Sequence, residues 1–585
     1  MNRNKLFSTL LVVFVLLSLV LAACGGQPTP APAEAQPPAA QPTEAPAAQP
    51  TQAEIAQPTE APQPTEAPAA ANKVATFIWT QEFDTLNPLY SNMWFSSTTW
   101  PLWSCYAWLF NDKEEPVPSL VSEIPSLDNG GISEDGKTIT LKLRDDLKWS
   151  DGTPLTSKDF IFTYEMFMDP NNAVASQAPY DKVDTMTAPD DQTVVITFTE
   201  PYAPWLGTLW HGILPEHVLQ PVFDSEGTLD TAEYNKAPTV GCGPFKFAEW
   251  ESGSFARFVA NENYWLGAPK IDEIFFRFVP DDASQVAALK NKEGVLGTFL
   301  SYPDADNLSK EGLTIYKVPS GYNEGFYFNF GDKANPGIKD LNVRLAIAYG
   351  TDRQAITNDL LLGLTEPAAT YWDNTQYVDP SITPYPYDPE KAKQLLDDAG
   401  WVDSNGDGTR DKDGVELKFT YGTTTREIRK DTQAVIQQQL AEIGIGVDLL
   451  NYESDNFFGG YAENGPAARG DLDIFEYSTV ANFPDPDTAE WLCSEIPSDE
   501  NPAGVNWSAL CDQKLNDLFV LQATQTDLAE RTNTFHEITK YIFDNVYWLG
   551  LWHDPDIWAI NPELQNVKLS GATPFYNSME WDLTQ

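Results

Sequence analysis

From residue 73 onward, short runs rich in aromatic and β-branched residues alternate with longer stretches in which apolar residues recur at helical spacing. Runs of the first kind predict β-strands, and stretches of the second kind predict amphipathic helices. The predicted strands are Val74–Thr80, Thr138–Leu143, Thr193–Phe198, Phe255–Ala260, Glu273–Val279, Phe326–Phe330, Glu416–Tyr421 and Gly446–Leu450. This alternation is typical of an α/β protein, and we expect mixed sheets.

Two of the predicted helices have clear start and stop signals. Asp388 stands at the N-cap, Pro389 occupies the first helical position, and Gly400 follows the last apolar residue of the stripe. Proline suits the first turn because its missing N–H would be unbonded there, and glycine accepts a left-handed C-cap. The stretch 427–443 keeps its aliphatic residues on one face, and Gly444 ends it.

The first 23 residues have the pattern of a secretory signal peptide. Arg3 and Lys5 form a short basic region, and an apolar run from Leu10 to Ala23 follows. That run is shorter than the ~20 residues that a membrane span needs. It ends in Leu-Ala-Ala-Cys-Gly, which resembles the lipobox of bacterial lipoproteins, so we predict cleavage before Cys24 and lipidation of its thiol. The alternative is an ordinary signal peptide followed by a chance cysteine.

Residues 24–72 are predicted to be a disordered tether behind the lipidated cysteine. The stretch 25–71 contains twelve prolines, three copies of Pro-Thr-Glu-Ala and one large aliphatic residue, Ile55. Such a composition cannot bury enough apolar surface to offset the entropy of ordering. An extended proline-rich chain rises ~3.1 Å per residue, so this one could hold the body on the order of 100 Å from a membrane.

The remaining residues, 73–585, form the body. A single core stops growing near ~250–300 residues, so we expect two or three domains. The net charge of −49 argues against nucleic acid and against an anionic lipid surface as partners, and it is compatible with a neutral or cationic ligand. We therefore expect contact with a membrane through the lipid anchor only, on the extracytoplasmic face of a bacterial cell membrane, in a periplasm or at the cell surface.

Four cysteines remain in the body, and two disulfides are expected in an oxidising compartment. Four cysteines permit three connectivities. Cys493 and Cys511 are close in sequence and flank one loop, so we pair them, which leaves Cys105 with Cys242. Neither pair has the spacing of a metal site.

The chain is poor in catalytic patterns. Its four histidines show no zinc-binding spacing, and it has no nucleophile elbow, no phosphate-binding loop and no dinucleotide fingerprint. Its 85 acidic residues make any chosen carboxylate pair uninformative. We predict that the protein is not an enzyme and has no cofactor, and an extracellular hydrolase is the alternative from another functional class.

One loop has some character of a calcium site. Asp403, Asn405, Asp407 and Asp411 occupy positions 1, 3, 5 and 9 of a calcium-binding loop, but glycine replaces the bidentate glutamate expected at position 12. A tight turn between a helix and a strand explains the same residues, and it is the favoured interpretation.

Five motifs, taken in order, resemble those of the family 5 solute-binding proteins, the dipeptide, oligopeptide and nickel receptors of ABC importers. The matching stretches are Lys137–Phe160 with Trp149-Ser-Asp-Gly152, Gly243–Lys246 with Trp250, Asn263–Trp265 with Pro269–Asp272, Val343–Ala348 with Asp352 and Arg353, and Asp388–Trp401. The resemblance extends over essentially all of 73–585, and the common order of the five motifs is more specific than any one motif.

The resemblance implies a two-lobed, periplasmic-binding-protein-like clamshell of the class II type with an extra inserted domain. Domain I would comprise 73–112, 201–325 and 551–585, domain II 113–200, and domain III 326–550. A solute would be enclosed between the lobes by hinge closure, and the closed form would dock on a membrane permease. We expect a monomer.

The resemblance weakens where ligand specificity is decided. Peptide receptors of this family hold the ligand's ammonium with an aspartate, and Asn482 matches that position. Glu476 could supply the negative charge instead, whereas Thr479 matches a tryptophan of the family. We therefore expect a peptide or peptide-like solute, with an oligosaccharide receptor as the alternative. A third possibility is a binding module that serves a sensor or a chaperone. The sequence does not distinguish this function from import.

The predicted pocket draws on both lobes. In domain I, four tryptophans lie in the segment nearest the expected cleft, and we assign at least half of them to core packing: Trp94, Trp100, Trp103 and Trp108. Of these, Trp94 is the predicted contact. The complete set of predicted ligand contacts is Trp94, Tyr452, Glu476, Tyr477 and Asn482, with Phe483 and Asp485 shaping the loop.

Overall fold

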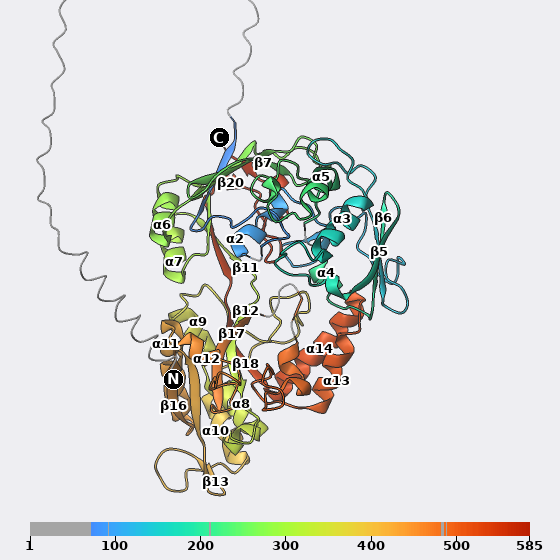
Figure 1. The fold of residues 1–585 in the computed structure, drawn as a ribbon. Helices are drawn as coiled ribbons and strands as arrows, with labels where there is room; N and C mark the ends of the chain where they lie inside the picture. The colour runs from blue at the N-terminus through green and yellow to red at the C-terminus, as the bar shows by residue number, and fades with distance from the viewer. Residues whose placement is uncertain (1–71, 92, 210–211, 481–484, 487, 585) are drawn as a thin grey trace, which may run out of the picture. The chain divides into compact units, whose positions relative to one another are not determined.

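The computed structural model describes residues 72–91, 93–209, 212–480, 485, 486 and 488–584 (Figure 1). The predicted signal peptide, the lipidated Cys24 and nearly all of the predicted tether lie outside the described residues.

Seven strands form the first sheet, in the order β11-β19-β10-β1-β9-β8-β7. Their bounds are Val74–Trp79 (β1), Phe245–Glu251 (β7), Phe255–Ala260 (β8), Glu273–Phe278 (β9), Leu296–Thr298 (β10), Thr314–Val318 (β11) and Asp556–Ile560 (β19). Strand β1 runs parallel to β9 and β10, and the other pairs are antiparallel. Alternation along β1 sends Phe77 into the main core of this sheet and Ile78 toward helices α6 (Asp282–Lys290) and α7 (Tyr302–Lys310).

A smaller antiparallel sheet is inserted into this part of the chain. It comprises β4 (Thr138–Lys142), β6 (Thr193–Phe198) and β5 (Val183–Asp190), with α3 (Ser157–Met168) packed against it. Its hydrophobic core is continuous with residues outside 113–200, among them Trp108 and Trp205. We call the two sheets and their helices the first lobe. Its further elements are β2 (Trp108–Phe110), β3 (Pro116–Pro118), α2 (Trp94–Ser97), α4 (Trp205–Thr208), α5 (Glu216–Glu226), β20 (Leu564–Gln565) and β21 (Asp582–Leu583).

Five strands form the sheet of the second lobe, in the order β16-β15-β17-β12-β18. Their bounds are Tyr322–Phe328 (β12), Lys418–Thr424 (β15), Gly446–Tyr452 (β16), Ile474–Val480 (β17) and Trp548–His553 (β18). Helices α8 (Leu341–Gly350), α10 (Pro389–Asp398) and α11 (Glu427–Glu442) cover one face, and α13 (Gln513–Gln522) and α14 (Leu528–Asn545) cover the other. Phe326 points to the first face and Tyr327 to the second. Shorter elements are α9 (Arg353–Asp359), α12 (Ser454–Phe457), β13 (Asp411–Lys412) and β14 (Val415–Glu416).

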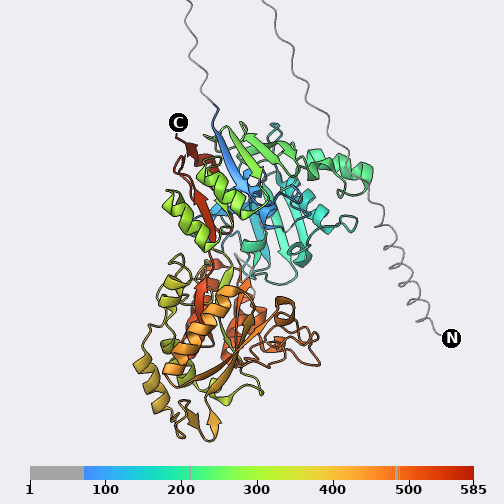
Figure 2. The same ribbon diagram turned by 90° about the vertical axis from the view of Figure 1, so that its left-hand side faces the viewer.

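Two chain connections join the lobes where one strand leads directly into another. Strand β11 continues into β12, and β18 continues into β19 through Asp554 (Figure 2). Asp554 ties these connections together: its side chain accepts hydrogen bonds of 2.8 Å from the Tyr302 hydroxyl and the Trp552 indole, and its carbonyl accepts one from Ser320. A pair of adjacent extended connections is a geometry that suits a hinge.

The predicted elements are largely confirmed. Asp388 caps α10 through a hydrogen bond from the Lys391 N–H, and strands β6 and β8 have the predicted bounds. Strand β12 begins at Tyr322, so the domain boundary drawn at residue 326 falls inside a strand, as does the one at residue 551 in β18. The three-domain division stays a prediction, because the chain from Ala70 to Gln585 forms one compact unit.

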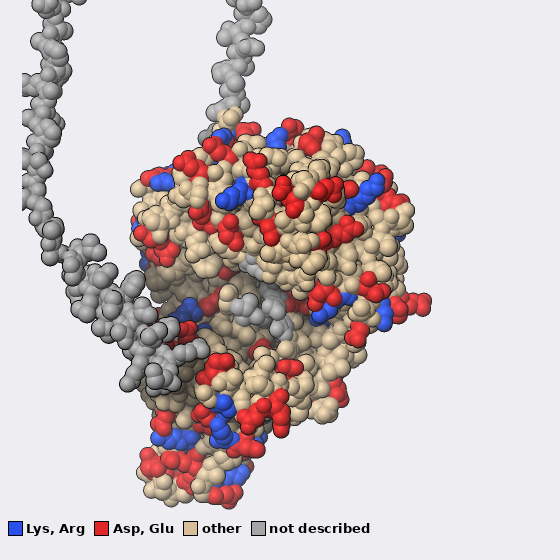
Figure 3. Space-filling view, viewed as in Figure 1, with Lys and Arg blue, Asp and Glu red and all other residues tan. Residues whose placement is uncertain are grey.

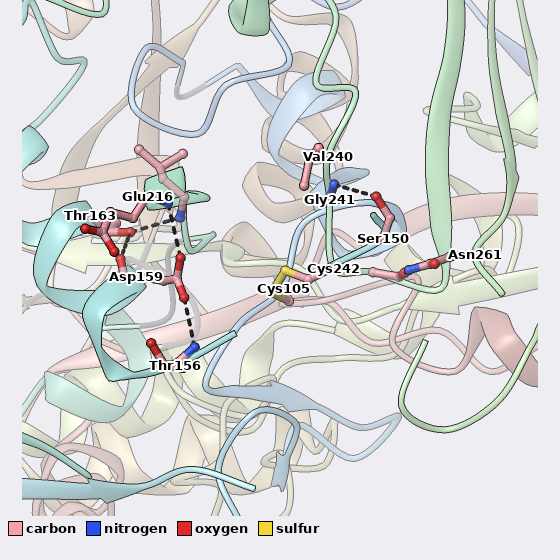
Figure 4. Close-up of a disulfide and its surroundings, with 12 residues drawn as sticks. Cys105, Ser150, Thr156, Asp159, Thr163, Glu216, Val240, Gly241, Cys242 and Asn261 are labelled. Atoms are coloured by element: carbon pink, nitrogen blue, oxygen red, sulfur yellow. Dashed lines mark hydrogen bonds between the residues drawn. A yellow bond between two sulfur atoms is a disulfide. The ribbon is translucent and has the colours of Figure 1, made fainter. Parts of the chain in front are cut away.

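Both predicted cysteine pairs occur in the structure. The Cα atoms are 5.4 Å apart in Cys105–Cys242 and 4.8 Å apart in Cys493–Cys511. Figure 4 shows the first pair beside Gly241, whose N–H donates to the Ser150 hydroxyl at 3.2 Å.

Three of the sequence motifs meet beside this disulfide, at a contact region that we call the seam of the first lobe. Asn261 donates to the Gly243 carbonyl at 2.8 Å, and Asn263 donates to the Ser150 carbonyl at 2.9 Å. A Cβ atom on Gly243 would lie 2.5 Å from the Leu102 carbonyl oxygen, so only glycine fits there. These motifs therefore hold the first lobe together.

Candidate functional site

Strand β17 sends predicted site residues to both faces of the second sheet. Because side chains alternate along a strand, Glu476 points to the face covered by α8 and α11, whereas Tyr477 points to the face covered by α13 and α14. Thr479 lies on the face of Tyr477, near the end of the strand. Two adjacent predicted contacts therefore have different surroundings.

Glu476 is fully buried in the core of the second lobe. The hydroxyl of Tyr421 donates to its Oε2 atom, and Glu324 lies nearby, bound to Arg429 by hydrogen bonds of 2.8 and 2.9 Å. Burial and the negative charge of Glu324 raise the pKa of Glu476 well above its usual range. A solute between the lobes cannot touch this carboxyl group, so the geometry gives no support to Glu476 as a ligand contact.

On the opposite face, five side chains converge, which we call the tyrosine–glutamate cluster: Tyr327, Tyr371, Tyr477, Thr479 and Glu490. The hydroxyls of Tyr371 and Tyr477 donate to the two carboxylate oxygens of Glu490, the second at 3.4 Å. Thr479 Oγ1 lies 2.9 Å from the Tyr371 hydroxyl and is also hydrogen-bonded to the hydroxyl of Tyr327. Four separate segments of the chain thus bring polar groups to one point.

The tyrosines of this cluster are held in their neutral, hydrogen-donating form. Burial raises the pKa of Tyr327, Tyr371 and Tyr477 well above the usual range, and the negative charge of Glu490 raises it further. Each hydroxyl can therefore donate a hydrogen bond across the whole physiological pH range.

Aromatic rings enclose the cluster. Tyr477 stacks on Tyr327 with ring centroids 4.4 Å apart, and the rings of Trp491 and Tyr371 are perpendicular with centroids 5.4 Å apart. Phe458, which is 42 % exposed, lies 5.8 Å from Tyr477. The predicted contact Tyr452 joins this group through Phe457, whose ring lies 6.3 Å from both Tyr452 and Tyr477. The structure thus links Tyr452 and Tyr477 through the buried ring of Phe457.

Asp485 anchors the end of the loop that follows β17. Its carboxylate is bound to Arg531, whose Nη2 donates to Oδ2 at 3.1 Å, and the Tyr377 hydroxyl donates to Oδ1 at 3.1 Å. Arg531 also donates to Gln522 at 2.9 Å and to the carbonyl of Ala203, in the first lobe, at 3.1 Å. The role of Asp485 in shaping the loop stays a prediction. Asn482 and Phe483 lie outside the described residues.

Trp94 is the predicted contact in the first lobe, and it is half-buried. Its ring and the ring of Phe299 form a T-shaped pair with centroids 5.0 Å apart. Phe299 is 53 % exposed and has a φ of +64°, a conformation that non-glycine residues rarely adopt. The Trp94 indole is hydrogen-bonded to Asp556, whose pKa is raised to about 7 by burial. Trp100, Trp103 and Trp108 are buried in the core.

The two aromatic groups belong to different lobes. Trp94 packs against the core of the first sheet, and Tyr452 and Tyr477 pack in a core of the second. Figure 3 shows the surface hollowed between the parts that carry the two sheets, with acidic side chains spread over both.

The calcium-like loop uses its oxygens to hold its own turn. Asp403 accepts hydrogen bonds from the N–H groups of Gly406 (2.7 Å) and Gly408 (3.0 Å), and Asp407 accepts one from Thr409. Asn405 and Asp411 likewise bind neighbours within the loop. Among the described residues, no group of three or more histidine, cysteine or acidic side chains is arranged to hold a metal ion. The geometry supports the turn interpretation.

Sequence reasoning missed Glu490, Tyr371 and Phe299. Glu490 is one of 85 acidic residues, and no motif marks it. Tyr371 belongs to an irregular segment between α9 and α10, far from β17 along the chain. Only the backbone angle of Phe299 sets it apart, and the sequence does not reveal that angle.

The comparison with known families identifies the chain. The model of the bacterial extracellular solute-binding proteins, family 5, matches residues 115–495. The chain belongs to this family. Its members are solute-binding receptors of the extracytoplasmic space, which agrees with the fold and with the motifs that indicated it. Within the described residues, no helix is both long and apolar enough to cross a membrane.

Individual relatives extend over most of the chain. A putative ABC transporter peptide-binding protein of Brucella ovis is 30 % identical over 432 residues, which cover 72 % of this chain and 77 % of the relative. The oligopeptide-binding protein AppA of Bacillus subtilis is 26 % identical over 478 residues, covering 80 % and 83 %. The solved structure of that AppA in complex with a nonapeptide shares the fold, with a TM-score of 0.57 and 24 % identity; the match covers 88 % of this chain and 100 % of the chain in that structure.

Proposed function

We propose that this protein captures a peptide or peptide-like solute outside the cytoplasm and delivers it to the permease of an ABC importer, without chemical turnover. The observation that carries the proposal is its similarity, over 72–80 % of the chain, to relatives named as peptide-binding proteins. The two strand connections at Asp554 support the same reading, because they suit lobes that close on a solute.

Attachment to the membrane would be through Cys24. The lipobox-like sequence and the proline-rich stretch behind it support a lipid-anchored receptor whose body stands away from the bilayer. A lipid with several acyl chains gives stable anchoring, whereas one chain alone gives marginal binding. We propose that the receptor acts as a monomer at the extracytoplasmic face of the cell membrane.

A second candidate function is an oligosaccharide receptor on the same fold. It is favoured by the exposed ring of Phe299 beside Trp94, because sugar rings bind to aromatic faces. Replacement of Trp94 by alanine would abolish sugar binding on this reading.

The test is to identify the solute that the receptor retains. The full chain is purified in detergent without denaturation, and its bound solutes are released and measured by native mass spectrometry. A heterogeneous set of short peptide masses supports the proposal, and a ladder of hexose masses favours the sugar receptor. If no peptide or amine raises the melting temperature of the protein, the peptide proposal is refuted.

A further inference from the structure

The two lobes touch at a second place, away from the two chain connections at Asp554. The turn between α13 and α14, residues 523–527, belongs to the second lobe and lies against α4 of the first. The Trp205 indole donates a hydrogen bond of 2.8 Å to the carbonyl of Thr526. Both residues are buried, with exposed fractions of 1 % and 7 %. In Figure 1, α4 and α14 lie to one side of β11 and β12, so this contact is separate from the connections.

Neighbouring groups strengthen this contact. Arg531, near the start of α14, donates to the Ala203 carbonyl of the first lobe at 3.1 Å. Leu528 packs against a hydrophobic core of each lobe. A Cβ atom on Gly136, in the turn before β4, would lie 2.8 Å from the Thr526 Oγ1 atom, so the two segments approach closely there. The junction therefore combines two polar bonds with apolar packing.

Such a junction opposes opening of the lobes. Rotation about the two connections moves most those groups that lie away from them, so it would pull this contact apart. Both acceptors are main-chain carbonyls, which water would hydrate in an open form. The net gain from one buried hydrogen bond corresponds to a factor of roughly 2–10 in an equilibrium constant. A factor of this size changes the balance between two forms, because the minor form of a protein is commonly populated at ~0.1–10 %.

From this geometry we propose that the α13–α14 turn is a latch that holds the two lobes together, with Trp205 and Arg531 as its hydrogen-bond donors. The Arg531 guanidinium also binds Asp485, so the latch is connected to one of the predicted pocket residues. The inference rests on the proposed function in one respect: the latch sets how long a solute is retained, because a solute leaves from the open form. Its bonds join protein to protein, so the latch itself needs no particular solute.

The test uses Trp205→Phe in the full chain, purified in detergent, with Trp108→Phe as the matched control. Both tryptophans are buried in the first lobe, and their ring centroids are 5.4 Å apart. The Trp108 indole also donates to a carbonyl, that of Leu206 at 2.7 Å, but this bond lies within its own lobe. The general cost of replacing a buried tryptophan by phenylalanine is present in both variants, and only Trp205→Phe removes a bond between the lobes.

Two quantities are measured. The separation of the lobes is obtained by double electron–electron resonance between spin labels in Glu226→Cys (α5) and Glu537→Cys (α14), two exposed positions, before and after retained solute is removed. Retention is the release rate of a fluorescent degenerate tetrapeptide library. We expect Trp205→Phe to populate longer distances and to release the tetrapeptides roughly fivefold faster, and Trp108→Phe to keep the distances and the rate of wild type.

Distances in Trp205→Phe that equal those of wild type overturn the latch. An equal widening in both variants overturns it as well, because the effect would then come from packing within the first lobe. Longer distances with an unchanged release rate refute its role in retention. These results leave the proposed function standing, provided that the tetrapeptides bind wild type. If no tetrapeptide binds any variant while Trp205→Phe alone opens the lobes, the latch stands and the peptide function fails.

Discussion

The ion pair between Asp485 and Arg531 gives the sharpest prediction about stability. Both side chains are almost fully buried, with exposed fractions of 6 % and 3 %. Removing one member of a buried pair leaves the other charge without compensation, which costs about 3–5 kcal/mol. We therefore expect Asp485→Asn to destabilise the second lobe by about this amount, because Arg531 would keep only neutral partners.

The size of the shift in melting temperature follows from the size of the unit. In a domain of about 150–250 residues, 1 kcal/mol shifts the melting temperature by about 2–4 °C, so the expected drop is roughly 6–20 °C. Arg531→Met is expected to cause a similar drop, because it leaves the buried Asp485 carboxylate without a positively charged partner. The double variant should be less destabilised than the sum of the two, since neither charge is then left alone.

The assay is thermal unfolding of wild type, both single variants and the double variant. Asp544→Asn is the control, because its ion pair with Lys540 lies on the same helix but is 53 % and 66 % exposed. An exposed pair contributes at most about 1 kcal/mol. If Asp485→Asn costs no more than this control, or if the two single effects simply add, the reasoning from burial is refuted.

Three further predictions concern other parts of the molecule. Burial raises the pKa of Asp556 from 3.8 to about 7. The stability linked to its protonated form is therefore present at low pH and lost as the pH rises through about 7. Melting temperatures measured against pH should fall less steeply for Asp556→Asn than for wild type, and equal slopes would contradict this. Replacing Cys105 and Cys242 together by serine should lower the unfolding free energy by about 2–5 kcal/mol in urea titrations, and an unchanged midpoint would argue against the pair. Cys24→Ser should move the protein from the membrane pellet to the supernatant and abolish incorporation of labelled palmitate; retention in the pellet would refute the anchor.

The sequence by itself determined the local elements and the family. Alternation of apolar residues and the cap at Asp388 placed strands and helices close to their observed bounds, because these signals depend on near neighbours in the chain. Ordered motifs such as Gly243–Lys246 were informative for a related reason: they meet in a tightly packed seam that tolerates few substitutions.

Only the tertiary structure decided the chemistry at the end of β17. Because side chains alternate along a strand, the sequence shows that Glu476 and Tyr477 point in opposite directions. Helices cover both faces of this sheet, however, so the pattern of apolar residues does not show which face bears the tyrosine–glutamate cluster. Burial made Glu476 a core residue, and a long-range contact brought Tyr371 to Glu490 across more than a hundred residues. The role of a carboxylate depends on its exposure and partners, and those are set by segments that lie far apart in the sequence.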